Sequence, residues 1–225
     1  MKKIRILPSL LAADLGCLGE EIARVGASGA DGLHLDVMDG HFVPNLSFSP
    51  DVSVLCRRVL GAGVEVNTHL MMTNPDAYAL RFVEKGSSTV QFHLEVRDRV
   101  EVRQLSAALH AVGARVGLVL NPDTPAEVAL PYLDCADEVL CMTVFPGYGG
   151  QAFMSEVLPK IRQLREAAPE LELMVDGGVN FETGVLAAEA GANAFVAGSF
   201  LFKQADMAAA VGEMRARCEA AFGGR

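Results

Sequence analysis

The chain has 225 residues, of which 51% are hydrophobic and 21% charged, and its formal net charge is −9 at pH 7. This composition suits a globular protein with a large core. The acidic balance disfavours nucleic acid or an anionic membrane surface as a partner, and no apolar run reaches the length of a bilayer span. The amino-terminal residues lack a signal-peptide cleavage pattern and the five cysteines form no CxxC pair, so we expect a cytoplasmic protein with reduced thiols.

Short apolar runs alternate with longer amphipathic stretches along the chain. The predicted strands are residues 4–8, 32–38, 64–70, 89–93, 115–120, 138–143, 171–175 and 194–197, and helical patterns include 18–27, 76–85, 101–112, 155–167 and 181–190. Apolar strands separated by helices indicate parallel βαβ units. An open doubly wound sheet has the same local pattern, but eight units of roughly 28 residues favour a single (β/α)8 TIM barrel over residues 1–225.

Polar residues at the carboxyl ends of the strands are the candidates for chemistry, because function gathers at that rim of a barrel. On the second strand, His34 and Asp36 point to one face and the apolar residues between and beside them to the other. This pair could bind a metal ion or form a buried hydrogen bond. His69 ends the third strand and Asp176 the seventh. Taken singly, they could be a structural histidine and a helix-capping aspartate.

Taken together, the same four residues predict one metal centre. His34, Asp36, His69 and Asp176 would meet on one rim of the barrel. Two imidazoles and two carboxylates suit one divalent ion per chain, such as Zn, Fe(II), Mn or Co, with positions left for a substrate. Strands two and seven approach the axis from opposite sides. Asp36 and Asp176 could therefore face each other across a ligand and move a proton between the two faces of a carbon.

Three glycine-rich loops follow the last three strands and form a second candidate site. They contain Gly147, Tyr148, Gly149 and Gly150, then Gly177 and Gly178, then Gly198 and Ser199. Glycines let backbone N–H groups approach an anion, and the loops after strands seven and eight usually bind phosphate in this fold. The loops carry no Lys or Arg, so we expect backbone dipoles to bind the phosphate. Ordinary βα turns would have a similar composition.

Three methionines, Met38, Met71 and Met142, lie near strand ends. Methionine commonly fills gaps in a core. The functional alternative is an apolar collar over the metal, which would keep water away from a reactive intermediate.

Seven segments, spread over nearly the whole chain, occur in the same order as matching segments of a known family. They are LPSLLAAD at 7–14, HLDVMDGHFVPN at 34–45, HLM at 69–71, GLVLNP at 117–122, PGYGGQ at 146–151, VDGGV at 175–179 and GS at 198–199. Together they resemble the ribulose-phosphate 3-epimerase family, and the second-strand segment is the most specific. Asn67-Thr68 stands where the family commonly has Asp-Val, and Phe145 where it has Asn or His. Both departures lie near the site and bear on substrate preference.

The resemblance implies the roles of individual residues. It makes His34, Asp36, His69 and Asp176 the metal ligands, Asp36 and Asp176 the acid–base pair, and Ser9, His69, Asp176 and the glycine loops the substrate contacts. It implies a homo-oligomer, either a dimer or a hexamer, that acts in the pentose phosphate pathway. The implied reaction is the interconversion of D-ribulose 5-phosphate and D-xylulose 5-phosphate at C3 through a metal-stabilised enediolate.

Three other functions compete with this one. An epimerase of another phosphoketose, such as D-allulose 6-phosphate, would share every residue named above. A metal-dependent hydrolase would need a site open to water, which the methionine collar argues against. A non-catalytic phosphosugar-binding protein would not be expected to have both aspartates.

Overall fold

The computed structural model describes residues 2–98 and 100–224, and these contain eight parallel strands. Residues 1, 99 and 225, which include both ends of the predicted domain, lie outside the described residues. The strands are β1 (Arg5–Pro8), β2 (Gly32–Met38), β3 (Glu65–Met71), β4 (Thr89–His93), β5 (Arg115–Leu120), β6 (Glu138–Met142), β7 (Glu172–Asp176) and β8 (Ala194–Ala197). From β2 to β8 each strand pairs with the next, and β1 pairs with β8.

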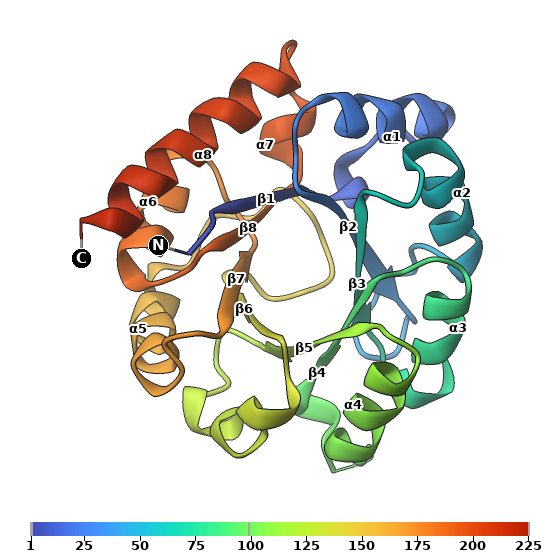
Figure 1. Cartoon of the computed structure of the whole chain (residues 1–225), viewed down its shortest axis with the longest axis vertical. Coiled ribbons are helices and arrows are strands. Elements are labelled where there is room, and N and C mark those ends of the chain that lie inside the picture. The colour runs from blue at the N-terminus through green and yellow to red at the C-terminus, as the bar shows by residue number, and fades with distance from the viewer. Residues whose placement is uncertain (1, 99, 225) are drawn as a thin grey trace.

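The two edges of this sheet meet and close it into a barrel. A parallel bridge joins Ser9, directly after β1, to His34 in β2. The strands form a ring with helices around it (Figure 1). This confirms the predicted (β/α)8 TIM barrel, and it excludes the open doubly wound sheet, whose edge strands would remain apart.

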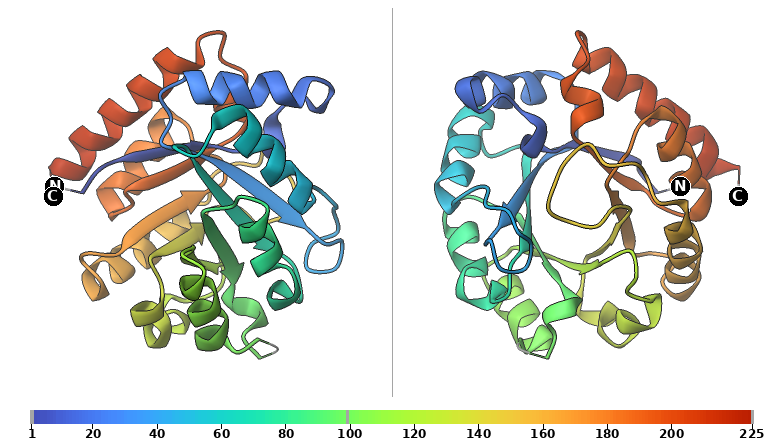
Figure 2. Two further views of the ribbon diagram at one scale, coloured as in Figure 1. Left: turned by 45° about the vertical axis from the view of Figure 1, so that its right-hand side comes forward. Right: turned by 180° about the vertical axis from the view of Figure 1, so that it is seen from behind.

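Helices cover the outside of the barrel (Figure 2). They are α1 (Leu18–Ala27), α2 (Pro50–Leu60), α3 (Ala79–Glu84), α4 (Val102–Ala111), α5 (Leu158–Ala167), α6 (Phe181–Ala190), α7 (Ser199–Phe202) and α8 (Met207–Gly223). The five predicted helical patterns all contain a helix. Two begin with a separate 3₁₀ turn, over Pro75–Ala77 and Ser155–Val157. The connection between β5 and β6 holds only 3₁₀ turns, Ala126–Val128 and Leu130–Cys135, because its prolines interrupt α-helical hydrogen bonding.

Side-chain alternation along each strand separates two apolar layers. In β2, Leu33, Leu35 and Val37 pack outward into the large core between strands and helices. The inside of the barrel is filled by a smaller cluster: Leu7, Val119, Leu140, Met142, Val144, Met174, Ala194 and Val196. The strand residues between the outward-facing ones therefore point into the barrel, which places His34 and Asp36 on its inner side.

Charged side chains close the amino-terminal end of the barrel. Arg5 forms ion pairs with Glu65 and Glu172, and Arg115 lies 3.3 Å from the fully buried Glu138. Burial and the neighbouring Glu172 raise the pKa of Glu138 to about 7. Three carboxylates face two guanidinium groups here, so holding one proton on Glu138 leaves the cluster neutral.

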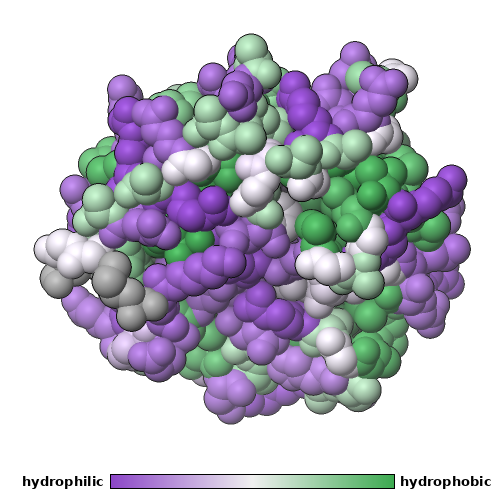
Figure 3. Space-filling view, turned by 45° about the horizontal axis from the view of Figure 1, so that its top comes forward, coloured by the Kyte–Doolittle hydropathy of each residue, from purple (hydrophilic) through white to green (hydrophobic). Residues whose placement is uncertain are grey.

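On the face of the molecule drawn in Figure 3, hydrophilic side chains are widespread, with apolar areas between them. In α1, for example, Ile22 and Val25 are buried against the barrel, whereas Glu20 is exposed to solvent. Among the described residues, no helix is long and apolar enough to cross a membrane.

Candidate active site and metal centre

The carboxyl ends of β2, β3 and β7 bring together the four predicted metal ligands. One ligand atom from each of His34, Asp36, His69 and Asp176 lies within 4.8 Å of the others. The register explains this meeting, because Asp36 in β2 lies beside His69 in β3. Asp176 is the last residue of β7, and Met174, two residues before it, also points into the barrel. The four side chains therefore converge at one depth inside the barrel.

Asp36 is the centre of this group. Its Oδ1 atom lies 3.1 Å from Nδ1 of His69 and 3.3 Å from Nε2 of His34, and its Oδ2 atom accepts a hydrogen bond from the Ser9 hydroxyl. Oδ2 of Asp176 lies farther from the same two ring nitrogens, at 3.8 Å from His34 and 3.9 Å from His69. The four ligand atoms thus surround a small space at the base of a cavity.

The electrostatics of the group set the two aspartates apart. Burial would raise the pKa of Asp36, but the charge of the adjacent His34 and the close contact with His69 outweigh burial and lower it. Burial and the charge of Asp36 raise the pKa of Asp176 to about 7. Burial lowers the pKa of His69 to about 4, so its imidazole is neutral at pH 7. A neutral imidazole has the lone pair that a metal ion requires.

His34 gives an independent indication that the residues fit a metal ion. Its side chain is fully buried, and neither ring nitrogen has a hydrogen-bond partner among the described residues. Nε2 of His34 lies 3.3 Å from Asp36 but without hydrogen-bonding geometry. Burial would lower the pKa of His34, but the charge of Asp36 outweighs burial and raises it. A buried polar atom without a partner is costly. A divalent cation between two imidazoles and two carboxylates would satisfy it.

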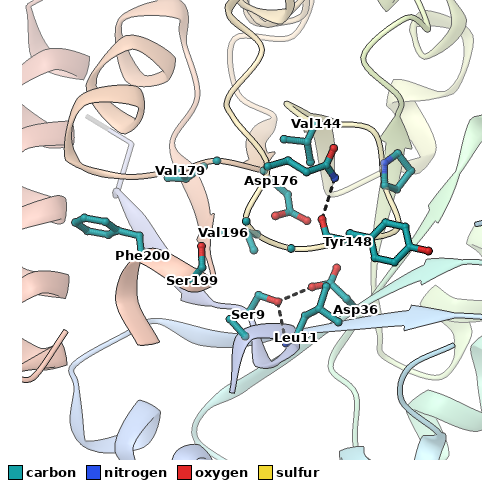
Figure 4. Close-up of a pocket in the computed structure, with 18 of the residues that line it drawn as sticks. Ser9, Leu11, Asp36, Val144, Tyr148, Asp176, Val179, Val196, Ser199 and Phe200 are labelled. Carbon is teal, nitrogen blue, oxygen red and sulfur yellow. Dashed lines mark hydrogen bonds between the residues drawn. The ribbon is translucent and has the colours of Figure 1, made fainter. Parts of the chain in front are cut away.

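Asp36 and Asp176 both line a cavity of about 330 Å³ (Figure 4). Other predicted site residues line it: Ser9, Met38, Met71, Met142, Gly147, Tyr148, Gly149, Gly150, Gly177, Gly178, Gly198 and Ser199. His34 and His69 are fully buried beneath it. The yellow loop after β6 extends across the mouth of the barrel in the right-hand view of Figure 2. The tertiary structure thus places the methionines, the glycine loops and both aspartates around one space.

Two of the glycines are required by the backbone itself. Gly177 and Gly178 have φ angles of +120° and +66°. A Cβ atom on Gly178 would lie 2.5 Å from the backbone nitrogen of Phe153, and one on Gly177 would lie 2.4 Å from a Val144 methyl group. Tight packing of the chain is therefore one sufficient reason for these glycines. Gly149 differs, because a Cβ atom there would meet nothing within 4 Å.

Two residues near the site have no place in the sequence prediction. Lys203, which directly follows α7, lines the cavity, so a cation lies near the glycine loops although the loops contain none. His93 ends β4 and its Nε2 atom lies 2.9 Å from Nε2 of His69. The position of His93 at a strand end was the available signal. Lys203 gives no local signal, because it reads as part of the helical region after β8.

The chain is similar to known proteins over nearly its whole length. The model of the ribulose-phosphate 3 epimerase family matches residues 5–202. The ribulose-phosphate 3-epimerase of Bacillus subtilis (strain 168) is 42% identical over 217 residues, covering 94% of this chain and 98% of that protein. The cytoplasmic isoform of the enzyme from Oryza sativa subsp. japonica is 41% identical over 218 residues, covering 96% and 94%.

Solved structures of other proteins share the fold at low sequence identity. KGPDC from Streptococcus mutans has a TM-score of 0.74 and 14% identity, covering 99% of this chain and all of that one. A 3-hexulose-6-phosphate synthase has a TM-score of 0.68 and 19% identity, covering 96% of this chain and 99% of that one. These likenesses concern the barrel alone. The family match and the relatives above 40% identity decide the matter: the chain belongs to the ribulose-phosphate 3-epimerase family.

Proposed function

We propose that this protein interconverts D-ribulose 5-phosphate and D-xylulose 5-phosphate by moving a proton at C3. The observation that carries the proposal is the meeting of two aspartates and two buried histidines, with ligand atoms within 4.8 Å of one another, at the base of a cavity lined by glycine loops. Membership of the family and the names of its relatives support the choice of substrate.

The residues that would hold one divalent ion, such as Zn, Fe(II), Mn or Co, are His34, Asp36, His69 and Asp176. When bound, the ion would act as a Lewis acid that stabilises negative charge on the substrate oxygens. The protein supplies the remaining chemistry. The Ser9 hydroxyl donates to Asp36 and holds its carboxylate in place, and the neutral ring of His69 offers a lone pair toward the same centre.

The two aspartates are the proposed acid and base. One carboxylate removes the C3 proton from one face of the substrate, and the other returns a proton to the opposite face. Their environments differ in the way this division requires, because the pKa of Asp36 is lowered while that of Asp176 is raised to about 7. In the reverse direction the two residues exchange roles. Met38, Met71 and Met142 line the cavity and would limit the entry of water.

The phosphate group would lie against the glycine loops after β6, β7 and β8. Backbone N–H groups there can approach an anion closely, and Lys203 adds a positive charge at the same cavity. The protein has a net charge of −9 and would repel a phosphorylated sugar at long range. The positive charge of Lys203 offsets this repulsion locally. An epimerase of another phosphoketose, such as D-allulose 6-phosphate, would use the same groups, and relative kcat/KM values for the two substrates decide between them.

A coupled assay with D-ribulose 5-phosphate tests the proposal. The protein is treated with chelator, dialysed, and assayed before and after addition of each of the four metals. We expect activity to disappear with the metal and to return with at least one of them. His34→Ala and His69→Ala should lose bound metal, whereas His110→Ala, at an exposed histidine paired with Asp137, should not. Full turnover in metal-free protein would refute the metal-dependent mechanism.

We also propose that the protein is cytoplasmic, acts in the pentose phosphate pathway and forms a homo-oligomer. A relative from Oryza sativa subsp. japonica bears the name cytoplasmic isoform. Leu15 and Leu46 are 67% and 75% exposed, which is unusual for large apolar side chains and suits contact with a second copy. Light scattering that finds only monomers at micromolar concentration would contradict the oligomer.

A further inference from the structure

His93 forms a contact with the proposed metal ligand His69 that fixes the behaviour of both rings. The side chains are fully buried, and the rings are stacked with centroids 5.0 Å apart and an interplanar angle of 25°. Their Nε2 atoms lie 2.9 Å apart. Two ring nitrogens at this distance can form a hydrogen bond only if one carries a proton and the other does not. The contact therefore has a direction.

Glu95 sets that direction from the other side of His93. Its Oε2 atom lies 2.9 Å from Nδ1 of His93, and its Oε1 atom accepts hydrogen bonds from the backbone N–H of Asn121 at 2.8 Å and from the Thr124 hydroxyl. Burial would raise the pKa of Glu95, but hydrogen bonds from His93, Thr124 and Asn121 lower it to about 2. An ionised carboxylate only accepts hydrogen bonds, so Nδ1 of His93 must be the donor.

The remaining proton positions follow from this direction when each of the two rings carries one proton. With its proton on Nδ1, His93 presents a bare Nε2 atom to His69. His69 must donate from its own Nε2 atom, which leaves Nδ1 without a proton. That Nδ1 atom lies 3.1 Å from Asp36 and 3.9 Å from Asp176. Without a metal ion, the Asp36 carboxylate competes for a proton on the same atom, so the bare Nδ1 is the arrangement that a bound cation requires. The free lone pair of His69 is thus directed into the centre formed by the four ligands.

We propose that Glu95 and His93 are positioning residues that fix the tautomer of His69, so that its unprotonated Nδ1 atom faces the metal centre. The inference rests on the proposed function, since it concerns a ligand of the proposed metal. Partners behind a ligating histidine commonly hold its ring and tautomer in this way. Here the partner is a second histidine, itself oriented by a carboxylate that the backbone N–H of Asn121 and the hydroxyl of Thr124 hold in place.

The substitution Glu95→Gln distinguishes this role from simple packing. The carboxamide oxygen would stay with the two donors at Asn121 and Thr124, so the NH2 group would face Nδ1 of His93. His93 would then carry its proton on Nε2, and His69 would be forced to carry one on Nδ1, toward the metal centre. Glu95→Ala only removes the acceptor. The variant closer in shape should therefore be the more damaging one, whereas a packing role predicts the reverse order.

The first readout is the Kd for Zn²⁺, measured by calorimetry on chelator-treated protein. Loss of a partner behind a metal ligand typically weakens binding about 10- to 100-fold; we expect Glu95→Gln to fall in this range and Glu95→Ala to lose less. The matched control is Asp137→Asn, because Asp137 also accepts from a ring nitrogen, that of His110 at 2.9 Å, and from a backbone N–H, that of Val116 at 2.7 Å. It should bind Zn²⁺ as the wild type does. Thermal unfolding of each metal-free variant checks that the barrel is intact.

The second readout is direct. Long-range ¹H–¹⁵N spectra of protein labelled at histidine report which nitrogen of each ring carries the proton. In wild-type protein with Zn²⁺ we expect the proton on Nδ1 of His93 and on Nε2 of His69. A proton on Nε2 of His93, or a Glu95→Gln variant that binds Zn²⁺ as tightly as the wild type, would overturn the inference. If the wild type binds no Zn²⁺, the proposed metal centre fails, and the spectra of metal-free protein still decide the inference by the same assignment for His93.

Discussion

Replacing each aspartate separately by asparagine is the sharpest test of the proposed proton transfer. Asp36→Asn and Asp176→Asn keep the shape of the side chain but remove its ability to accept a proton. The two positions are not equivalent in the structure. Asp36 lies 3.1 and 3.3 Å from the imidazole nitrogens of His69 and His34 and accepts a bond from Ser9, whereas Asp176 stands 3.8 and 3.9 Å from the same nitrogens.

These contacts give different magnitudes for the two variants. Loss of a general acid or base typically costs about 10²- to 10⁴-fold in rate, and we expect that range for Asp176→Asn. Asp36→Asn also places an amide against two ring nitrogens at the centre of the ligand group. This variant should therefore lose bound metal as well, and its rate should fall by more than that range. Asp134→Asn, at an exposed carboxylate paired with Arg103, is the matched control and should leave kcat unchanged.

Isotope exchange in D2O separates the roles of the two carboxylates. An enzyme that lacks only the reprotonating acid can still exchange the C3 proton of one epimer without forming the other. The variants Asp36→Asn and Asp176→Asn should therefore introduce deuterium into different epimers. Proton NMR of the recovered sugar measures this, with the metal content of each sample determined in parallel. Near-normal turnover by either variant with metal bound, or the same exchange bias in both, would refute the two-aspartate mechanism.

Three further predictions concern the surroundings of these residues. Ser9→Ala removes the hydrogen bond to the Asp36 carboxylate and should lower kcat about 10-fold or more, as for a bond to a charged group, with metal content unchanged; equal kcat in variant and wild type would show that the bond has no role. Lys203→Met should raise KM roughly twofold to fivefold, because an exposed ion pair contributes a free energy of that size. The effect should vanish at high salt, and a change in KM that does not depend on salt would contradict a charge effect. The pKa of Glu138 rises from 4.5 to about 7 on folding, so the folded state binds more protons than the unfolded state in this window and stability falls as pH rises through it, by on the order of 3 kcal/mol. Urea unfolding at pH 5 and pH 8 should show this loss of stability in the wild type but not in Glu138→Gln. If the free energy of unfolding of the variant falls with pH as much as that of the wild type, the assignment to Glu138 is refuted.

The sequence by itself determined the repeating architecture and the identity of the reactive groups. Both are local properties. The alternation of side chains along a strand places His34 and Asp36 on one face, and the same strands and helices that the apolar pattern predicts are found in the barrel. The order of the seven segments, of which the one at 34–45 is the most specific, was enough to indicate the family. The pattern defined the bounds of α1 and α6 but not the starts of α3 and α5, which follow separate 3₁₀ turns over Pro75–Ala77 and Ser155–Val157, because terminal turns depend on local packing.

Only the tertiary structure decided which distant side chains meet. Closure of the sheet through Ser9 and His34 distinguishes the barrel from an open sheet, and the strand sequence is compatible with both. His93 became part of the site only through the register that sets β4 beside β3, and Lys203 through the single turn of α7 that returns the chain to the cavity. Periodicity along a chain predicts which way a side chain points, but it does not predict its distance from residues on other strands. Contacts of this kind therefore form only when the barrel closes.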